Sequence, residues 1–207
     1  MPRVHTATRK RAVLKHAMVC RHCREEIAVG QKYYSWERRY GGKQYLHTSC
    51  RRPRPTELSS RKTAAIEEAV MDASFPEASF DMPSDGSLPE AEAEGYLTDL
   101  RSVLEDVAGV VRDVGEQYQD AFDNLPENFQ YGATGEALQQ VAEACEEKAS
   151  DLESFDFSAD EPDWPEREDE ESDEDFRGRV EEAFDTWAQD MRSEAEDALS
   201  DMPEYEG

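Results

Sequence analysis

Hydrophobic residues recur at steps of three and four through much of the second half of the 207-residue chain. This period is typical of amphipathic helices and predicts helices at about 89–124, 134–155 and 174–202. Each helix has a single apolar face, so the three together predict an antiparallel bundle. The longest helix carries a heptad-like seam at Leu97, Leu100, Leu104, Val107, Val111, Val114, Tyr118 and Ala121.

Three small residues in these helices have specific expectations. Gly109 and Gly115 each weaken a helix by about 1 kcal/mol relative to alanine, unless a neighbouring element packs closely there. Cys145 is the single cysteine in the helical pattern, and we expect it to be a small core residue rather than a reactive one.

The pattern changes to β-forming residues between the basic N-terminus and residue 47. Residues 32–40 are rich in aromatic side chains, Gly41-Gly42 is a two-residue turn signal, and residues 43–46 return. Strand alternation places Tyr34, Trp36, Arg38 and Tyr40 on one face of this predicted hairpin. A unit this small buries little surface, so we expect Trp36 and one or two tyrosines to form its core.

Three segments connect these elements. Residues 56–73 predict a short amphipathic helix that is capped by Ser59 or Ser60. Residues 74–89 contain three prolines and a glycine and are typical of a linker. Residues 156–175 form a connection whose last 16 residues include 11 acidic ones, and we expect self-repulsion to leave it disordered.

Four cysteine and histidine residues bracket the hairpin in two pairs. Cys20 and Cys23 are separated by two residues, and so are His47 and Cys50. A two-residue gap places both side chains of a pair on one side of a tight turn, where both can reach one ion. Three thiolates and one imidazole complete a tetrahedron, so the sequence predicts one structural zinc per chain, with no open position for a substrate.

Other uses of these cysteines fit the sequence less well. A redox pair at Cys20 and Cys23 lacks the strand–helix pattern of a thioredoxin-like unit. Disulfides need an oxidising compartment, whereas residues 1–19 are basic and lack the apolar run of a signal peptide. We therefore expect a reducing, cytoplasmic location.

His22 lies inside the Cys20–Cys23 turn, and we expect it to be exposed rather than a ligand.

The order of turn, hairpin and second ligand pair is that of a treble clef. Cys-x2-Cys followed by His-x2-Cys resembles the PARP-type zinc finger of DNA-break sensors over residues 15–55, although the gap between the pairs is shorter here. It also resembles the first half of a LIM domain, but no second finger follows. The whole chain resembles uncharacterised proteins of tailed viruses of bacteria and archaea, which implies a prokaryotic host and no particular activity.

The predicted fold class is mainly α, with a small zinc-bound β-hairpin finger followed by an acidic antiparallel three-helix bundle. The predicted organisation has five parts: a basic arm (1–19), the finger (20–55), a short helix (56–73), a linker (74–89) and the bundle (90–202).

Charge is divided unevenly between the two ends. The formal net charge is -26, yet residues 1–62 hold 16 of the 23 basic residues and only 4 of the 49 acidic ones. Such asymmetry points to an interaction partner. We expect DNA or RNA to bind residues 1–62 and a basic protein to bind residues 90–202. The expected nucleic-acid contacts are Arg38, Arg39, Lys43, Arg51, Arg52, Arg54 and the ring of Tyr40.

Three functional readings remain open. The first is a non-enzymatic nucleic-acid-binding protein or adaptor. The second is an acidic DNA mimic or regulator that occupies a basic DNA-binding partner. The third is a salt-adapted structural protein, since only 6 of the 23 basic residues are lysine. We expect no enzyme, because no nucleophile–base pair or phosphate-binding glycine loop is present, and no membrane span, because no apolar stretch approaches 18 residues.

Overall fold

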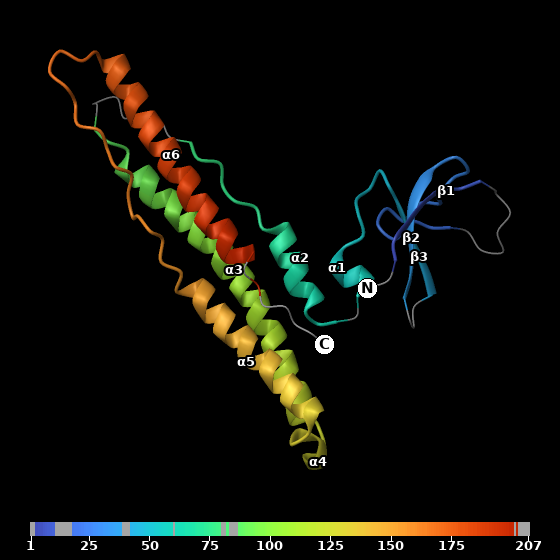
Figure 1. Ribbon diagram of the computed structural model, residues 1–207. Coiled ribbons are helices and arrows are strands. Elements are labelled where there is room, and N and C mark those ends of the chain that lie inside the picture. Colours follow the sequence, from blue (N-terminus) through green and yellow to red (C-terminus); the bar gives the residue numbers. More distant parts are fainter. Residues whose placement is uncertain are drawn as a thin grey trace. The chain divides into compact units, whose positions relative to one another are not determined.

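The computed structural model describes residues 3–10, 18–38, 42–59, 61–79, 82, 87–200 and 202. The chain forms two compact units, Met1–Glu68 and Ala69–Gly207, and each is described by itself. The elements in Figure 1 are β1 (His5–Thr8), β2 (Lys32–Arg38), β3 (Gly42–His47), α1 (Pro55–Leu58), α2 (Ala64–Asp72), α3 (Glu90–Asp123), α4 (Glu127–Gln130), α5 (Ala133–Glu153) and α6 (Asp173–Ser200).

A three-stranded antiparallel sheet in the order β1-β2-β3 forms the frame of the first unit. β2 and β3 make the predicted hairpin, in which Tyr34 lies opposite Leu46 and Trp36 opposite Gln44. Of the predicted two-glycine turn, Gly41 lies outside the described residues. Gly42 has a φ of 67°, a conformation that glycine adopts without steric cost.

The N-terminal residues include a strand where we expected only a basic arm. β1 pairs with β2, with Ala7 opposite Tyr33. Arg9 follows it and is buried, donating hydrogen bonds to the Ile27 carbonyl and, at 2.8 Å, to the Glu26 carboxylate. β1 has the polar sequence His-Thr-Ala-Thr, which gives no hydrophobic signal for a strand. Its pairing therefore depends on the open edge of β2. The rest of the predicted arm, residues 11–17, lies outside the described residues.

The core of the first unit surrounds Trp36, which is 1% exposed. Its indole Nε1 donates a hydrogen bond of 2.9 Å to the Glu57 carbonyl. The prediction that Trp36 belongs to this core is confirmed, whereas the tyrosines, predicted as one or two core residues, number three and are only partly buried. The side chains buried with it are Met18, Cys20, Ile27 and Leu46, with Tyr33, Tyr34 and Tyr45 partly buried against them.

A buried carboxylate, Glu57, fixes the short helix α1 after the sheet. Its oxygens accept hydrogen bonds from the Arg51 guanidinium at 2.8 and 2.9 Å and from the Arg54 backbone N–H at 2.9 Å. Burial alone would raise the pKa of Glu57, but these donors stabilise the carboxylate, and its pKa lies below the ordinary 4.5. Pro55 occupies the first position of α1, where its missing N–H is not needed.

The second unit is organised on α3, the longest helix. α5 packs antiparallel along the C-terminal part of α3, as predicted (Figure 1). The two helices approach most closely where a Cβ added at Gly115 would lie 2.9 Å from the Cβ of Cys145. Cys145 is fully buried, which confirms its prediction as a core residue. At Gly109, by contrast, an added Cβ would meet nothing within 4 Å.

The third helix, α6, runs in the same direction as α3, as the third helix of an antiparallel up–down–up bundle does, but it packs on the early part of α3 and not along α5 (Figure 1). Tyr96, near the start of α3, lies beside Phe184 and Trp187 of α6 and donates a hydrogen bond of 3.3 Å to the Ala188 carbonyl. α5 is much shorter than α3 and leaves this early part of the seam uncovered. The connection 154–172 can span up to about 60 Å, so it can carry the chain back to the start of α3.

That connection is anchored in the structure, whereas we expected disorder. Phe157 is 5% exposed, and the Trp164 ring stacks on Phe184 with a centroid distance of 6.4 Å. The Ala159 carbonyl accepts a hydrogen bond of 3.3 Å from Trp187 Nε1. In the sequence, the many acidic residues outweighed these few apolar residues. Their contacts fix the segment although its carboxylates repel one another.

The segments around α2 also differ in detail from the expectation. α2 begins at Ala64, after a turn in which the Ser59 hydroxyl accepts a hydrogen bond of 3.1 Å from the Arg61 N–H. Part of the predicted linker is packed in the second unit: the Arg192 guanidinium lies 5.8 Å from the Phe75 ring centroid, and Pro89 is fully buried. Residues 80, 81 and 83–86 of this linker lie outside the described residues.

Gly115→Ala and Gly109→Ala form a matched pair within α3. Gly109→Ala should stabilise the second unit by about 0.5–1 kcal/mol, because it restricts the unfolded chain and meets nothing in the fold. Gly115→Ala should destabilise it, because α5 must move away from the new methyl group. Urea unfolding followed by helical circular dichroism measures both changes, and equal effects would contradict the close packing at Gly115.

Glu57→Gln should weaken the first unit by about 1–3 kcal/mol at neutral pH, since Arg51 loses a charged partner. Because the pKa of Glu57 in the folded unit lies below 4.5, this contribution is present above that pH and is lost as the carboxylate protonates. Glu25→Gln, at an exposed carboxylate of the same unit, is the control. Hydrogen exchange of the β2 and β3 amides reports the difference, which should be absent for the control.

Candidate metal centre

The ligand atoms of Cys20, Cys23, His47 and Cys50 all lie within 4.8 Å of one another. The Cys20 and Cys50 sulfurs are 3.9 Å apart, and His47 Nδ1 lies 3.3 Å from the Cys23 sulfur and 3.8 Å from that of Cys50. A tetrahedral zinc, with bonds of about 2.3 Å to sulfur and 2.0–2.1 Å to nitrogen, separates its ligands by about 3.5–3.8 Å. The four side chains therefore fit a single tetrahedral metal ion.

The first ligand pair is held by backbone hydrogen bonds of its turn. The Arg24 N–H donates to the Cys20 carbonyl at 3.0 Å, and the Cys20 N–H donates to the Glu25 carbonyl at 2.8 Å. Arg24 has a φ of 65°, which lets the chain reverse immediately after Cys23. The Arg21 N–H donates to the Tyr45 carbonyl at 3.0 Å, so the turn is attached to β3.

The second ligand pair lies at the end of β3 and in the turn that follows. The Cys50 N–H donates to the His47 carbonyl at 3.2 Å, and His47 is 5% exposed. Its Nε2 lies 3.1 Å from Gln31 Oε1. An Nε2–H donated to Gln31 leaves the Nδ1 lone pair for the metal and fixes the ring orientation. Gln31 is a supporting residue that the ligand spacing did not reveal; its place just before β2, across from His47, is visible only in the fold.

The surroundings of the thiols differ from one ligand to the next. Burial raises the pKa of Cys20, but hydrogen bonds from the backbone N–H groups of His47, Cys23 and His22 outweigh it and lower that pKa to about 6. Burial and the neighbouring thiols of Cys23 and Cys20 raise the pKa of Cys50 to about 11. Three thiolates this close repel one another, and a bound divalent cation offsets that repulsion.

The other cysteine and histidine expectations can be compared with the same geometry. All four cysteines are free thiols, so no disulfide competes with the metal cluster. His22 is exposed beside the turn, as expected. Cys145 lies in the second unit and takes no part in the cluster.

The expected nucleic-acid contacts fall into three groups. Two of the arginines already have carboxylate partners: Arg51 pairs with Glu57 at 2.8 Å, and Arg54 pairs with Glu68 at 2.6 Å. These pairs support α1 and α2, a role that the sequence did not indicate. Arg39 and Tyr40 lie outside the described residues, and Arg38 belongs to β2 with its side chain not described.

Lys43 and Arg52 form the third group. Both are exposed, and neither has an ion pair with a described residue. The Lys43 ammonium lies 5.9 Å from the Tyr45 ring centroid. The described tyrosines of the sheet are partly buried in the core, so they are less available for base stacking than the sequence suggested.

Comparisons of the chain with protein-family models, with curated proteins and with solved structures found no match. The identification of the cluster as a metal site therefore rests on the distances, burial and hydrogen bonds of its own residues.

Proposed function

We propose that Cys20, Cys23, His47 and Cys50 hold one structural zinc ion and that the chain is a non-enzymatic binding protein. The observation that carries this proposal is the closeness of the four ligand atoms, which all lie within 4.8 Å of one another with three of the pairs at 3.3–3.9 Å, as suits a tetrahedral ion bound only by protein side chains. Such a site stabilises a fold and leaves no position for a reacting water. The free cysteines suit a reducing, cytoplasmic compartment.

His47→Ala and His22→Ala provide a matched test of the zinc site. His47→Ala should lower the zinc content well below one per chain and remove protection from residues 18–52, because metal binding of this kind contributes about 10–16 kcal/mol. His22→Ala should keep the zinc and the fold. Metal analysis and hydrogen exchange measure both, and a strong chelator should reproduce the His47→Ala result while sparing α3, α5 and α6. Full zinc content in His47→Ala would refute the ligand assignment.

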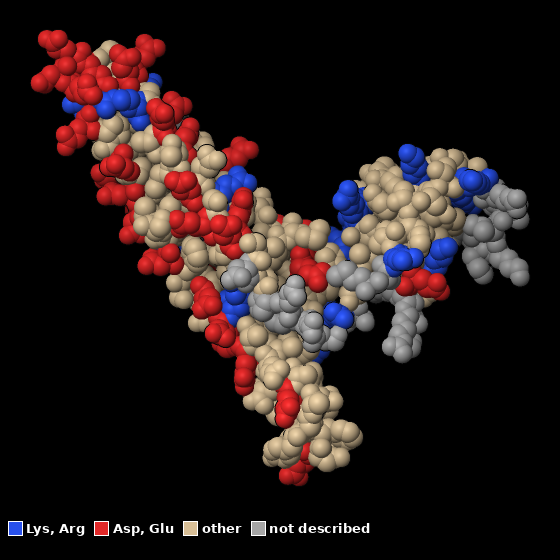
Figure 2. Space-filling view, viewed as in Figure 1, with Lys and Arg blue, Asp and Glu red and all other residues tan. Residues whose placement is uncertain are grey.

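We further propose that the first unit binds nucleic acid, DNA or RNA, through its cations. Its support is the charge excess of residues 1–62, where two of the four carboxylates, Glu26 and Glu57, are already paired with arginines. On the face of the first unit that Figure 2 shows, several exposed cations lie with few carboxylates among them to compete with phosphate. Lys43 and Arg52 are the most suitable contacts to test, because neither has an ion pair with a described residue that a substitution would break.

Lys43→Ala combined with Arg52→Ala should reduce affinity for nucleic acid severalfold without releasing zinc. Lys148→Ala combined with Arg177→Ala removes the same charge from the helical unit and should leave affinity nearly unchanged. Fluorescence anisotropy with single-stranded and duplex probes measures both variants. For duplex DNA, the log–log dependence of affinity on salt should have a slope of about -0.9 per phosphate contacted. No binding at about 50 mM salt, where such electrostatic attraction is strong, would refute this proposal.

A second candidate function concerns the helical unit. Carboxylates cover much of the visible surface of α3, α5 and α6, with few lysines or arginines among them (Figure 2). A rod of carboxylates attracts basic proteins and can occupy a DNA-binding partner. Among the described residues, no helix has the length and apolar character needed to cross a bilayer. Because of the carboxylates along its helices, we propose a basic protein as the partner of residues 90–202.

A further inference from the structure

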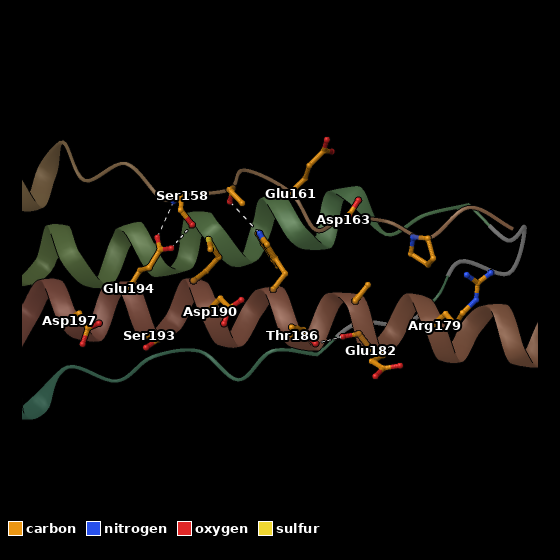
Figure 3. Close-up of a pocket in the computed structure, with 15 residues that line it drawn as sticks. Ser158, Glu161, Asp163, Arg179, Glu182, Thr186, Asp190, Ser193, Glu194 and Asp197 are labelled. Atoms are coloured by element: carbon orange, nitrogen blue, oxygen red, sulfur yellow. Dashed lines mark hydrogen bonds between the residues drawn. The ribbon is translucent and has the colours of Figure 1, made fainter.

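A pocket of about 810 Å³ lies in the second unit between the segment 158–165 and α6. Figure 3 shows α6 along one side and this segment along the other. Its apolar lining comes from both walls: Ala159 and Pro165 on the segment, and Ala183, Trp187 and Met191 on α6.

The pocket is held open by contacts at several points. The Ser158 N–H donates to Glu194 at 3.0 Å, and its hydroxyl bonds to the same carboxylate. The Ala159 carbonyl is tied to Trp187, and Phe157 is buried beneath the segment. The wall over α6 is therefore attached to the helical core at both backbone and side-chain level.

The charge of the lining is almost entirely negative. Glu182, Asp190 and Asp197 line the pocket along α6, and none of them has an ion pair with a described residue. The one cation in the lining, Arg179, is engaged by Glu171 at 2.8 and 2.7 Å. The lining thus combines apolar surface with carboxylates that lack a counter-charge.

We infer that this pocket is the docking site for an extended lysine- or arginine-rich segment of a partner protein. Long basic side chains match the lining, because their alkyl stems can lie on the partly exposed Pro165 and Ala183 while the charged ends reach the carboxylates. The pocket therefore offers a partner shape and apolar contact as well as negative charge. The inference rests on the second proposed function and names the place on the helical unit where that partner binds.

The spacing of the carboxylates sets the pattern of the partner. Glu182 and Asp190 are about 12 Å apart along α6, and Asp190 and Asp197 about 10 Å. An extended peptide rises about 3.3 Å per residue, so cations at every third or fourth position meet successive carboxylates. A segment with that spacing should bind more tightly than one with the same composition and its cations gathered at one end.

The test uses the full chain and a fluorescein-labelled peptide with lysine or arginine at every third or fourth position. Glu182→Gln combined with Asp190→Asn should weaken peptide binding about five- to tenfold at low salt. The matched control is Glu181→Gln combined with Asp185→Asn, two exposed carboxylates of the same helix outside this pocket. The control should change affinity by less than about twofold, since long-range charge alone is screened. Peptide binding should also slow hydrogen exchange in residues 158–165.

Each outcome separates the pocket from the broader proposal. If both double variants weaken binding equally, the acidic unit binds basic peptides but this pocket is not the site. If the unchanged chain binds no basic peptide at about 50 mM salt, the pocket and the second proposed function both fail. If a peptide with its cations gathered at one end binds as tightly as one with cations at every third or fourth position, the proposed match to the carboxylate spacing is wrong. Nucleic-acid affinity and zinc content should be the same in all these variants, because the first unit is untouched.

Discussion

The first unit depends on the convergence of four side chains from two turns. Its sheet has three short strands, and its core contains one tryptophan, a few aliphatic side chains and the half-buried tyrosines. So small a core contributes little stability by itself. Cys20 belongs both to that core and to the ligand cluster, so metal binding and core packing stabilise each other. The Arg51–Glu57 ion pair holds α1 in place, and the Glu57 carbonyl of that helix accepts a hydrogen bond from the Trp36 indole.

The second unit satisfies a different constraint, the need to bury a long seam on α3 beneath a highly acidic surface. α5 covers only the later part of that seam, and α6 packs on the earlier part, around Tyr96. The return connection has to cross the unit, and its apolar anchors attach it there. The acidic pocket follows from this anchoring, because the connection runs beside α6 and leaves a space between them that side chains of both line.

Local patterns predicted the local structure well. The two-residue spacing of the ligands identified Cys20, Cys23, His47 and Cys50, and the apolar periodicity identified three long helices. Features that depend on distant contacts were not accessible in the same way. β1 has no hydrophobic signal, Gln31 meets His47 only through the sheet, and the place of α6 on the early part of α3 follows from how little of that seam α5 covers. Arg51 and Arg54 looked like phosphate contacts because their carboxylate partners could not be assigned from the sequence.

The glycines of α3 show the same limit at a single position. Periodicity placed Gly109 and Gly115 in one helix with the same expected cost, and only the approach of α5 distinguishes them.

X-ray absorption spectroscopy at the zinc edge on the purified protein tests the metal site itself. We expect one zinc per chain with three sulfur ligands at about 2.3 Å and one nitrogen at about 2.0–2.1 Å. A spectrum dominated by oxygen ligands, or protein that holds no zinc, would contradict it.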